Sequence, residues 1–406
     1  MTRANFTAVL LALGLALPFA AAAEDAGVFK VPGTDSTIKF YGYAQLDGTV
    51  DFGARTPDIE NYDWATILPA VPADDTVDAD RSPQTYLTAR TSRFGIITST
   101  PTKAGAVGVR LEGDFNGPNG FQSETYTNSV VFRLRHAYGT FRGLLVGQTW
   151  STFLDLGAAP DTVDFNGPGS LALVRNPMIR YTLGFSPAMN LQLAVENNRG
   201  QQYGPSERFQ TVPDLHANLT YGAKWGHVSL RGVGQTYTRQ VGAAGSEENK
   251  SKLSVAGALS CSLKIGGDTL VAQFSGGPGI GRYLLNALGA GDANTLGFVN
   301  VDASDEIQLW TVYAYHVGFT HVWRPGLRSN AVWSQTFIQD AEIDGVAATN
   351  ATQEQLMQLF VNTFYSFAKN AEVGVEYSFG RWTSFGTPEL QGTQNRLSFS
   401  LHYNFF

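Results

Sequence analysis

The sequence predicts an all-β fold, a transmembrane antiparallel β-barrel, and three observations lead to it. Polar and apolar residues alternate along many segments of about ten residues, as in barrel strands that face lipid on one side. Short turns and long loops separate these segments in regular alternation. The chain is 43% hydrophobic and only 16% charged, with 12% aromatic residues and 44 glycines, which suits strands exposed to lipid.

The first 23 residues are predicted to form a secretory signal peptide, which is not part of the fold. Arg3 precedes an apolar run over residues 7–17, and the alanines at 21–23 form a cleavage site before Glu24. The apolar run is too short to cross a bilayer as a helix. We therefore expect a single mature barrel domain over residues 24–406.

The first mature strand, residues 38–51, shows the alternation most clearly. One face carries Phe40 and Leu46, and the other carries Gln45 and Asp47. Further strands are predicted over residues 85–98, 107–115, 130–141, 144–153, 178–185, 191–196, 215–221, 229–235, 253–264, 270–275, 307–323, 331–338, 359–367, 373–379 and 397–405. Residues 307–323 are apolar on both faces, so the count is about sixteen, to within two. Barrels of this size enclose an aqueous channel.

The connection over residues 154–176, between the fifth and sixth strands, is expected to fold into the bore. It carries Asp155, Asp161, Asp164 and Arg175. A simple surface loop is the alternative, because long surface loops are common. In a barrel, a structureless loop of this length can instead narrow the channel.

Basic residues occupy the polar faces of consecutive early strands. Taking the polar face as inward, the arginines predicted to line the constriction are Arg93, Arg110, Arg133, Arg135 and Arg180. The first four should form one basic arc, and arginines around a pore favour anions. Asp161 and Asp164 are expected across the bore from this arc. For any single arginine, a water-filled barrel that merely tolerates polar residues is the alternative.

Motifs of enzymes and cofactor-binding proteins are missing from the sequence. His316 and His321 are the closest histidines, and on a strand they would point to opposite faces, which argues against a metal site. The net charge of −7 argues against nucleic-acid binding. We expect no enzyme activity, no cofactor and no metal. An outer-membrane enzyme with a dispersed catalytic triad, and an adhesin with a plugged bore, remain the alternatives.

The sequence resembles the DcaP-like family of trimeric outer-membrane porins in six segments. These are IKFYGYAQLD (38–47), SRFGI (92–96), LEGDF (111–115), RLRHAYG (133–139), LLVGQTWSTFLD (144–155) and DFNGPGS (164–170). The resemblance implies a homotrimer of sixteen-stranded barrels in the lipid of the bacterial outer membrane, each with an inward-folded third loop. It also implies passive diffusion of small hydrophilic solutes, with a preference for small organic anions such as dicarboxylates.

Overall fold

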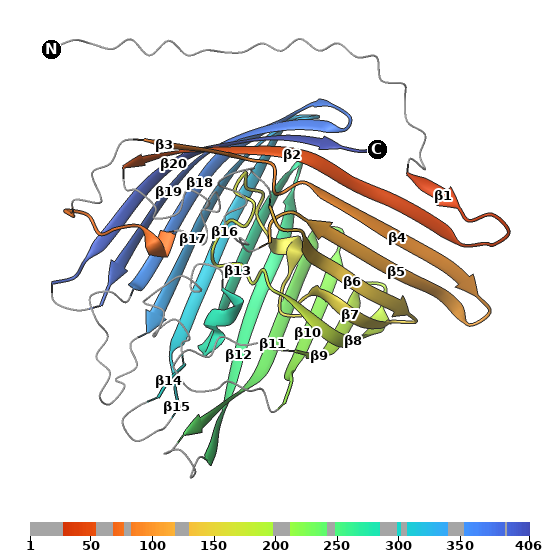
Figure 1. The fold of residues 1–406 in the computed structure, drawn as a ribbon, viewed down its shortest axis with the longest axis horizontal. Helices are drawn as coiled ribbons and strands as arrows, with labels where there is room; N and C mark the ends of the chain where they lie inside the picture. The colour runs from red at the N-terminus through yellow and green to blue at the C-terminus, as the bar shows by residue number, and fades with distance from the viewer. Residues whose placement is uncertain are drawn as a thin grey trace.

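The computed structural model shows a closed antiparallel β-barrel (Figure 1). It describes residues 27–53, 68–76, 83–117, 130–197, 212–241, 248–284, 299–301, 307–339, 353–385 and 388–406. The predicted signal peptide lies outside these residues. Within them, no helix is long and apolar enough to cross a membrane.

The wall of the barrel is one sheet of 18 strands, in which β1 (Val28–Lys30) and β3 (Gln84–Thr88) are short pieces paired with β2. The remaining strands confirm the predicted count of sixteen. They are β2 (Thr37–Gly53), β4 (Arg93–Thr102), β5 (Gly105–Asp114), β6 (Arg133–Phe141), β7 (Leu144–Trp150), β8 (Arg175–Ser186), β9 (Met189–Glu196), β10 (Asp214–Ala223), β11 (Gly226–Val241), β12 (Glu248–Ile265), β13 (Asp268–Pro278), β16 (Thr311–Arg324), β17 (Leu327–Gln339), β18 (Gln353–Ala368), β19 (Ala371–Ser384) and β20 (Gln391–Asn404).

Five short elements lie outside the wall. They are the small hairpin of β14 (Val299–Val301) and β15 (Ile307–Leu309), and the 3₁₀ turns η1 (Leu68–Ala70), η2 (Leu156–Ala158) and η3 (Ile280–Tyr283).

The barrel closes where β2 pairs with β20, from Tyr43 opposite Asn404 to Gly53 opposite Gln394. Across this seam the Arg396 guanidinium donates to both carboxylate oxygens of Asp51, at 2.6 and 2.8 Å. Closure leaves no strand edge in the barrel, and a lipid bilayer requires this because it cannot hydrogen-bond free backbone groups.

Several predicted strands differ from the structure. The strand predicted over residues 307–323 is divided into β15, which lies outside the wall, and β16, and the strand predicted over residues 144–153 ends at Trp150. The single strand predicted over residues 85–98 is wrong, because the chain turns at residues 89–92 and separates β3 from β4. The Thr91 hydroxyl donates to Asp47 in this turn. The strand predicted over residues 130–141 begins only at Arg133. It contains a bulge, since Glu112 lies opposite His136 while the next residue, Gly113, lies opposite Leu134.

The interior is polar along β4–β8, whereas along β11–β19 buried polar side chains are interspersed with an apolar cluster. Apolar side chains of β11–β19 pack against three chain segments that fold into the barrel, and together these make one buried cluster. From the wall the cluster includes Val233, Ala258, Val312, Ala314, Val332, Leu356, Phe360 and Trp382, and from the inserted segments it includes Leu68, Val71, Phe153, Ala172, Ile280 and Leu284. This cover explains why the segment predicted at residues 307–323 is apolar on both faces.

Candidate functional site

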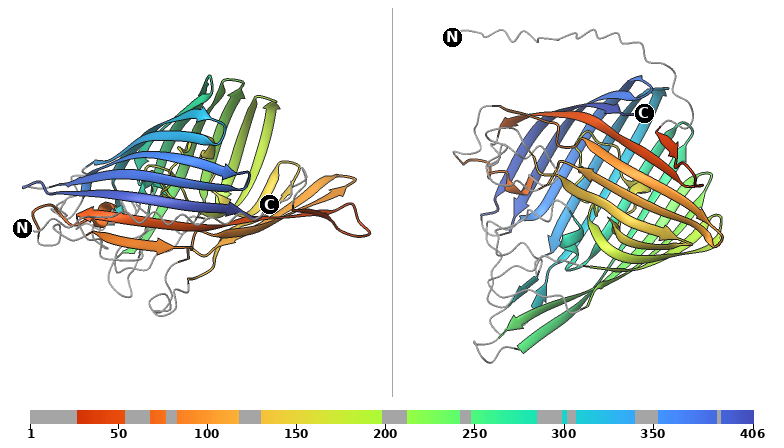
Figure 2. Two further views of the ribbon diagram at one scale, coloured as in Figure 1. Left: turned by 90° about the horizontal axis from the view of Figure 1, so that it is seen from above. Right: turned by 45° about the vertical axis from the view of Figure 1, so that its right-hand side comes forward.

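Loop L3, defined here as residues 151–174 between β7 and β8, runs inside the barrel (Figures 1 and 2). Its start is fixed to strands beyond β8. The Thr152 N–H donates to the Glu196 carboxylate of β9 at 2.7 Å. Arg231 of β11 donates to the Phe153 carbonyl oxygen at 2.6 Å. The prediction of an inward-folded third loop is therefore confirmed.

Asp155 anchors the next part of loop L3 to β11 and β12. Its Oδ2 accepts from His227 Nε2 at 2.8 Å and from Ser260 Oγ at 2.5 Å, and its Oδ1 caps η2 by accepting from the Gly157 N–H. Burial would raise the pKa of the Asp155 carboxyl, but the hydrogen bonds from Ser260 and His227 outweigh burial and lower that pKa. Ser260 and His227 both bond the same carboxylate oxygen, so β11 and β12 together hold this part of loop L3.

The tip of loop L3 is held by a buried carboxylate on β19. Glu376, which is fully buried, accepts from the backbone N–H groups of Val163 and Asp164 at 2.9 and 3.0 Å. Asn362 of β18 donates to the same carboxylate at 2.8 Å. The two loop N–H groups fix the path of this segment, because both would lose their buried acceptor if the loop moved.

The remainder of loop L3 follows the same side of the barrel. The Gly169 N–H donates to Gln358 Oε1 at 2.8 Å. His316 Nε2 donates to the Ala158 carbonyl oxygen at 3.0 Å, so its Nδ1 accepts from the Ser170 hydroxyl at 3.1 Å. Loop L3 is thus attached along β16–β19 and faces the opposite wall.

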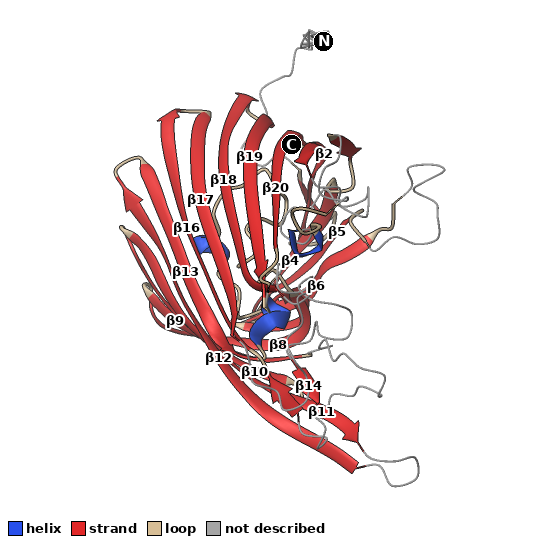
Figure 3. Cartoon of the chain, turned by 90° about the vertical axis from the view of Figure 1, so that its left-hand side faces the viewer, coloured by secondary structure: helices blue, strands red, loops and turns tan. Residues whose placement is uncertain are grey.

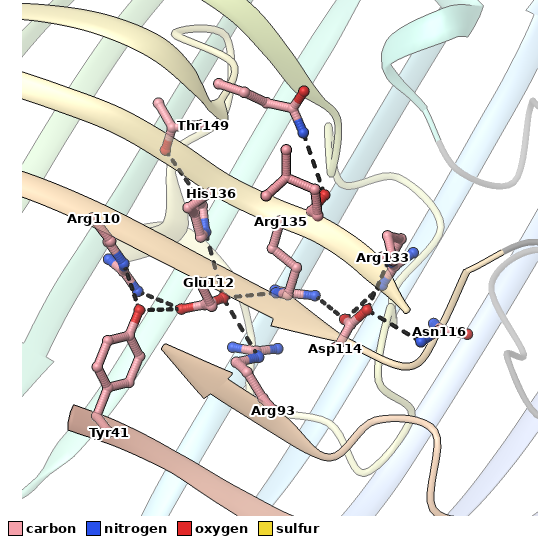
Figure 4. A network of polar contacts seen from close by, with 12 residues as sticks. Tyr41, Arg93, Arg110, Glu112, Asp114, Asn116, Arg133, Arg135, His136 and Thr149 are labelled. Carbon is pink, nitrogen blue, oxygen red and sulfur yellow. Dashed lines mark hydrogen bonds and ion pairs between the residues drawn. The ribbon is translucent and has the colours of Figure 1, made fainter. Parts of the chain in front are cut away.

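The opposite wall carries a network of arginines around two carboxylates (Figure 4). Glu112 of β5 lies between three of the arginines. Arg135 Nε donates to it at 2.7 Å and Arg110 Nη2 at 2.7 Å, while Arg93 Nε lies 3.5 Å away. Tyr41 also donates to Glu112, at 2.7 Å.

Asp114, two residues further along β5, continues the network. Its carboxylate accepts two bonds from Arg133, at 2.9 and 2.8 Å, and one from Arg135 Nη1 at 2.6 Å. Arg135 therefore bridges both acids. The bulge in β6 makes this possible, because Arg135 is the extra residue of the bulge and its side chain points inward together with that of His136.

A cavity of about 200 Å³ separates this network from loop L3. Its basic side is formed by Arg93, Arg135 and Arg175. The Arg175 guanidinium carbon stacks 4.0 Å from the centre of the Trp150 ring. Phe165 of loop L3 faces the same arginines, with its ring centre 5.8 Å from Arg93 Cζ and 5.6 Å from Arg135 Cζ.

The structure brings only part of the predicted constriction to this cavity. Arg93 and Arg135 line it, and so do Asp161, Asp164 and Arg175. Arg175 is, however, the first residue of β8 and not part of the loop.

The other predicted residues lie outside the cavity lining. Arg110 and Arg133 flank it within the same network. Arg180 lies further along β8, and Asp155 is the anchor on β11 and β12. Asp161 also pairs with Arg328 of β17 at 2.6 Å.

Sequence reasoning missed Trp150 and Phe165 as parts of the cavity. Trp150 ends β7 and Phe165 lies in the loop, and period-two alternation gives no inward assignment to either position. The anchoring role of Glu376 was also missed, although its inward phase was predicted. Among the described residues, no group of three or more His, Cys, Asp or Glu side chains is placed to hold a metal ion.

Known proteins share this architecture. The outer membrane channel DcaP of Acinetobacter baumannii is 24% identical, with a TM-score of 0.77 over 93% of this chain and 99% of that chain. The Vibrio cholerae outer-membrane protein OmpT is 11% identical, with a TM-score of 0.56 over 93% and 100% of the two chains. An anion-selective porin from Comamonas acidovorans is 12% identical, with a TM-score of 0.54 over 91% and 100%. At these identities the likenesses show the porin fold.

No curated protein matches the chain. A family model described as DcaP outer membrane protein matches residues 20–405. The match covers nearly the whole sequence, so this chain belongs to the DcaP outer membrane protein family and is an outer-membrane β-barrel of the porin type.

Proposed function

We propose that the barrel is a passive diffusion channel for small hydrophilic solutes and that it prefers small organic anions. The observation that carries this proposal is the excess of positive charge beside the cavity. Its basic wall holds two carboxylates, Glu112 and Asp114, among five arginines. Those arginines are Arg93, Arg110, Arg133, Arg135 and Arg175.

One of the cavity arginines keeps its charge for a solute, because no described carboxylate pairs with it. Arg175 makes no ion pair with any acid that the structure describes, and its contact is the Trp150 ring. A guanidinium held flat on an aromatic ring can offer its edge to a carboxylate.

The charges across the cavity support selection and not tight binding. At about 4 Å and an effective dielectric constant near 20, a pair of unit charges interacts with about 4 kcal/mol. Glu112 and Asp114 offset part of this attraction, and the Asp161 carboxylate lies on the loop side. We therefore expect modest anion selectivity that weakens as the ionic strength rises.

The test is the reversal potential of the double variant Arg93→Gln and Arg175→Gln in planar bilayers under a salt gradient. Wild type should favour anions, and the variant should move toward cation preference because both substitutions remove positive charge from the cavity. Arg142→Gln is the matched control, since Arg142 is an exposed residue of the turn between β6 and β7 and makes no ion pair with the carboxylates of this network. A double variant with the wild-type reversal potential would contradict the proposal.

Dicarboxylates are the proposed solutes because several guanidinium groups face one cavity. In proteoliposomes, the double variant should slow entry of a four-carbon dicarboxylate more than entry of a neutral sugar of similar size. Equal slowing of both solutes would mean that the arginines act on pore size and not on charge.

The same experiments separate the channel from its two rivals. An outer-membrane enzyme or an adhesin with a plugged bore would give no stepwise conductance when the purified protein is added to a planar bilayer. A porin gives steps that scale with salt concentration.

A homotrimer is the proposed assembly. It rests on the family resemblance and on OmpT of Vibrio cholerae, for which a trimer form is described. Native mass spectrometry of the protein in mild detergent should show three copies, and a mass of one copy at all concentrations would overturn it.

A further inference from the structure

Seven two-residue turns join neighbouring strands at one end of the barrel, and Figure 3 shows several of them as tan turns between the red strands at its top. Lys103, Arg142, Lys224 and Lys369 each occupy one of these turns, and Arg324 directly precedes another. We call these five residues the basic rim. No acid occupies any of the seven turns, although the whole chain has a net charge of −7. Charge is therefore segregated toward this end.

The basic rim is exposed and is not neutralised by the acids near it. All five side chains are exposed, and none makes an ion pair with an acid in the described part of the chain. The nearby acids are engaged elsewhere. Asp268 accepts from His321 at 2.9 Å and from the Val322 N–H at 2.9 Å. Glu372 accepts two bonds from Arg328, at 2.6 and 3.0 Å.

Aromatic side chains on the outer face stand next to the basic rim. Lys224 is followed by Trp225 and Arg324 is preceded by Trp323, and these two indoles are 41% and 62% exposed. The Arg324 guanidinium carbon lies 6.0 Å from the ring centre of Tyr365. Such tryptophans and tyrosines belong at the level of lipid headgroups, so the adjacent cations lie at the membrane surface.

The turn at Arg142 gives an independent sign that the charge matters there. Arg142 and Gly143 both have positive φ, 47° and 82°. A turn of this kind forms most easily with Asn-Gly or Gly-Gly, because other side chains are strained at positive φ. The arginine therefore does not serve the turn geometry. Its guanidinium carbon lies 5.6 Å from the Phe141 ring centre, beside the lipid-facing surface.

We propose that the basic rim binds the headgroups of anionic phospholipids in the leaflet that surrounds this end of the barrel. In outer-membrane barrels the short turns face the periplasm, so this is the inner leaflet. Basic residues near a membrane surface attract anionic lipid, and the attraction adds over several residues. The placement beside interfacial aromatics favours lipid over the cell-wall polymer beneath it, because the cations lie on the outer circumference of the barrel.

The test is lipid capture by the purified mature protein in a neutral detergent. The protein is mixed with equal amounts of phosphatidylglycerol and phosphatidylcholine of identical chains, and native mass spectrometry counts the bound lipids. We expect wild type to retain roughly fivefold more phosphatidylglycerol than phosphatidylcholine. Salt at ~0.5 M should reduce this ratio, because it screens charges beyond a few ångströms.

Two variants separate charge from shape. Replacing all five rim residues by glutamine should bring the ratio to about one, since the attraction comes from charge. The charge-retaining variant, with each lysine changed to arginine and each arginine to lysine, should keep the wild-type ratio. Heat-modifiable migration in gels checks that each barrel is folded. If the glutamine variant does not fold, Arg142→Gln and Lys224→Gln are measured singly and should each lower the ratio.

Three results would overturn the proposal. The first is a wild-type ratio near one. The second is a glutamine variant that folds and keeps the wild-type ratio. The third is binding of wild type to purified peptidoglycan sacculi that the glutamine variant loses, with no preference between lipids, because the basic rim would then recognise the cell wall.

Discussion

The two sides of the barrel interior differ in what covers them. The front wall, β4–β8, keeps a bare charged surface, in which arginines and carboxylates hold one another in place. The back wall, β11–β19, is covered by loop L3 and by two other inserted segments, and it carries a buried apolar cluster. The channel is therefore displaced toward the front wall. On our proposal, the front wall sets the ion selectivity of the channel, and the segments inserted against the back wall set its width.

Removing loop L3 should give the largest effect, a change in single-channel conductance, because it uncovers the back wall. Replacing residues 158–171 with a short glycine–serine linker deletes most of the loop side of the cavity. We expect single-channel conductance to rise on the order of twofold or more, since the passage then extends to the back wall. The measurement is conductance in planar bilayers, with a linker inserted in a short turn as the control. Unchanged conductance in a folded barrel would mean that loop L3 does not limit the passage.

The lumen face could be predicted from the sequence on most strands, including that of Glu376 on the back wall, but not for residues 307–323. Period-two alternation identifies a lumen face when that face is wet, as at Arg93 and Arg133. Where other chain segments cover the lumen face, both faces become apolar, as at Val312 and Ala314. The alternation is then lost, and no local signal tells which side is outside.

The bulge in β6 shows a second case in which the alternation of the sequence does not predict the direction of a side chain. The phase predicted for Arg133 and Arg135 is inward, and both side chains do point into the barrel. The reason differs from the prediction, because Arg135 is the extra residue of the bulge. Alternation alone would have turned His136 outward, yet that side chain is buried inside and bonded to Thr149 at 2.9 Å. A bulge depends on contacts across strands, which the local pattern does not contain.

The next largest effect, a loss of unfolding free energy, should come from removing the Glu376 carboxylate that holds the tip of loop L3. Glu376→Ala leaves the N–H groups of Val163 and Asp164 without their acceptor in a buried site, which costs about 1–3 kcal/mol of unfolding free energy. Urea unfolding in detergent measures this, and open-channel current noise should increase as the tip moves. Arg381→Ala is the control on the same strand, because Arg381 is exposed and does not contact loop L3. Equal losses in both variants would show that the tip is held by packing instead.

A smaller loss of unfolding free energy is expected when the contact between β19 and the segment inserted before β3 is weakened. Trp382 of β19 donates from Nε1 to the Val71 carbonyl oxygen at 2.9 Å and buries its ring in the back-wall cluster. Trp382→Phe keeps most of the apolar contact and removes the bond, which should cost about 1 kcal/mol of unfolding free energy. The reversal potential should not change, because this contact lies on the back wall. A shift in selectivity would contradict the division between the two walls.

The smallest effect is the pH dependence that Asp155, an anchor of loop L3, gives to the unfolding free energy. Its pKa is lowered in the folded barrel, because hydrogen bonds from Ser260 and His227 outweigh the burial that would raise it. A carboxylate with a lowered pKa stabilises the folded state above its unfolded value, about 4, and this contribution is lost as the pH falls through the folded value. Asp155→Asn has no charge to lose. The unfolding free energy of wild type should therefore exceed that of Asp155→Asn near pH 7, by up to about 1 kcal/mol, and the difference should shrink as the pH falls below about 4. Urea unfolding of both proteins across this range measures the difference, and a difference that stays constant would show that the anchor works as a neutral hydrogen-bond acceptor and not as a charge.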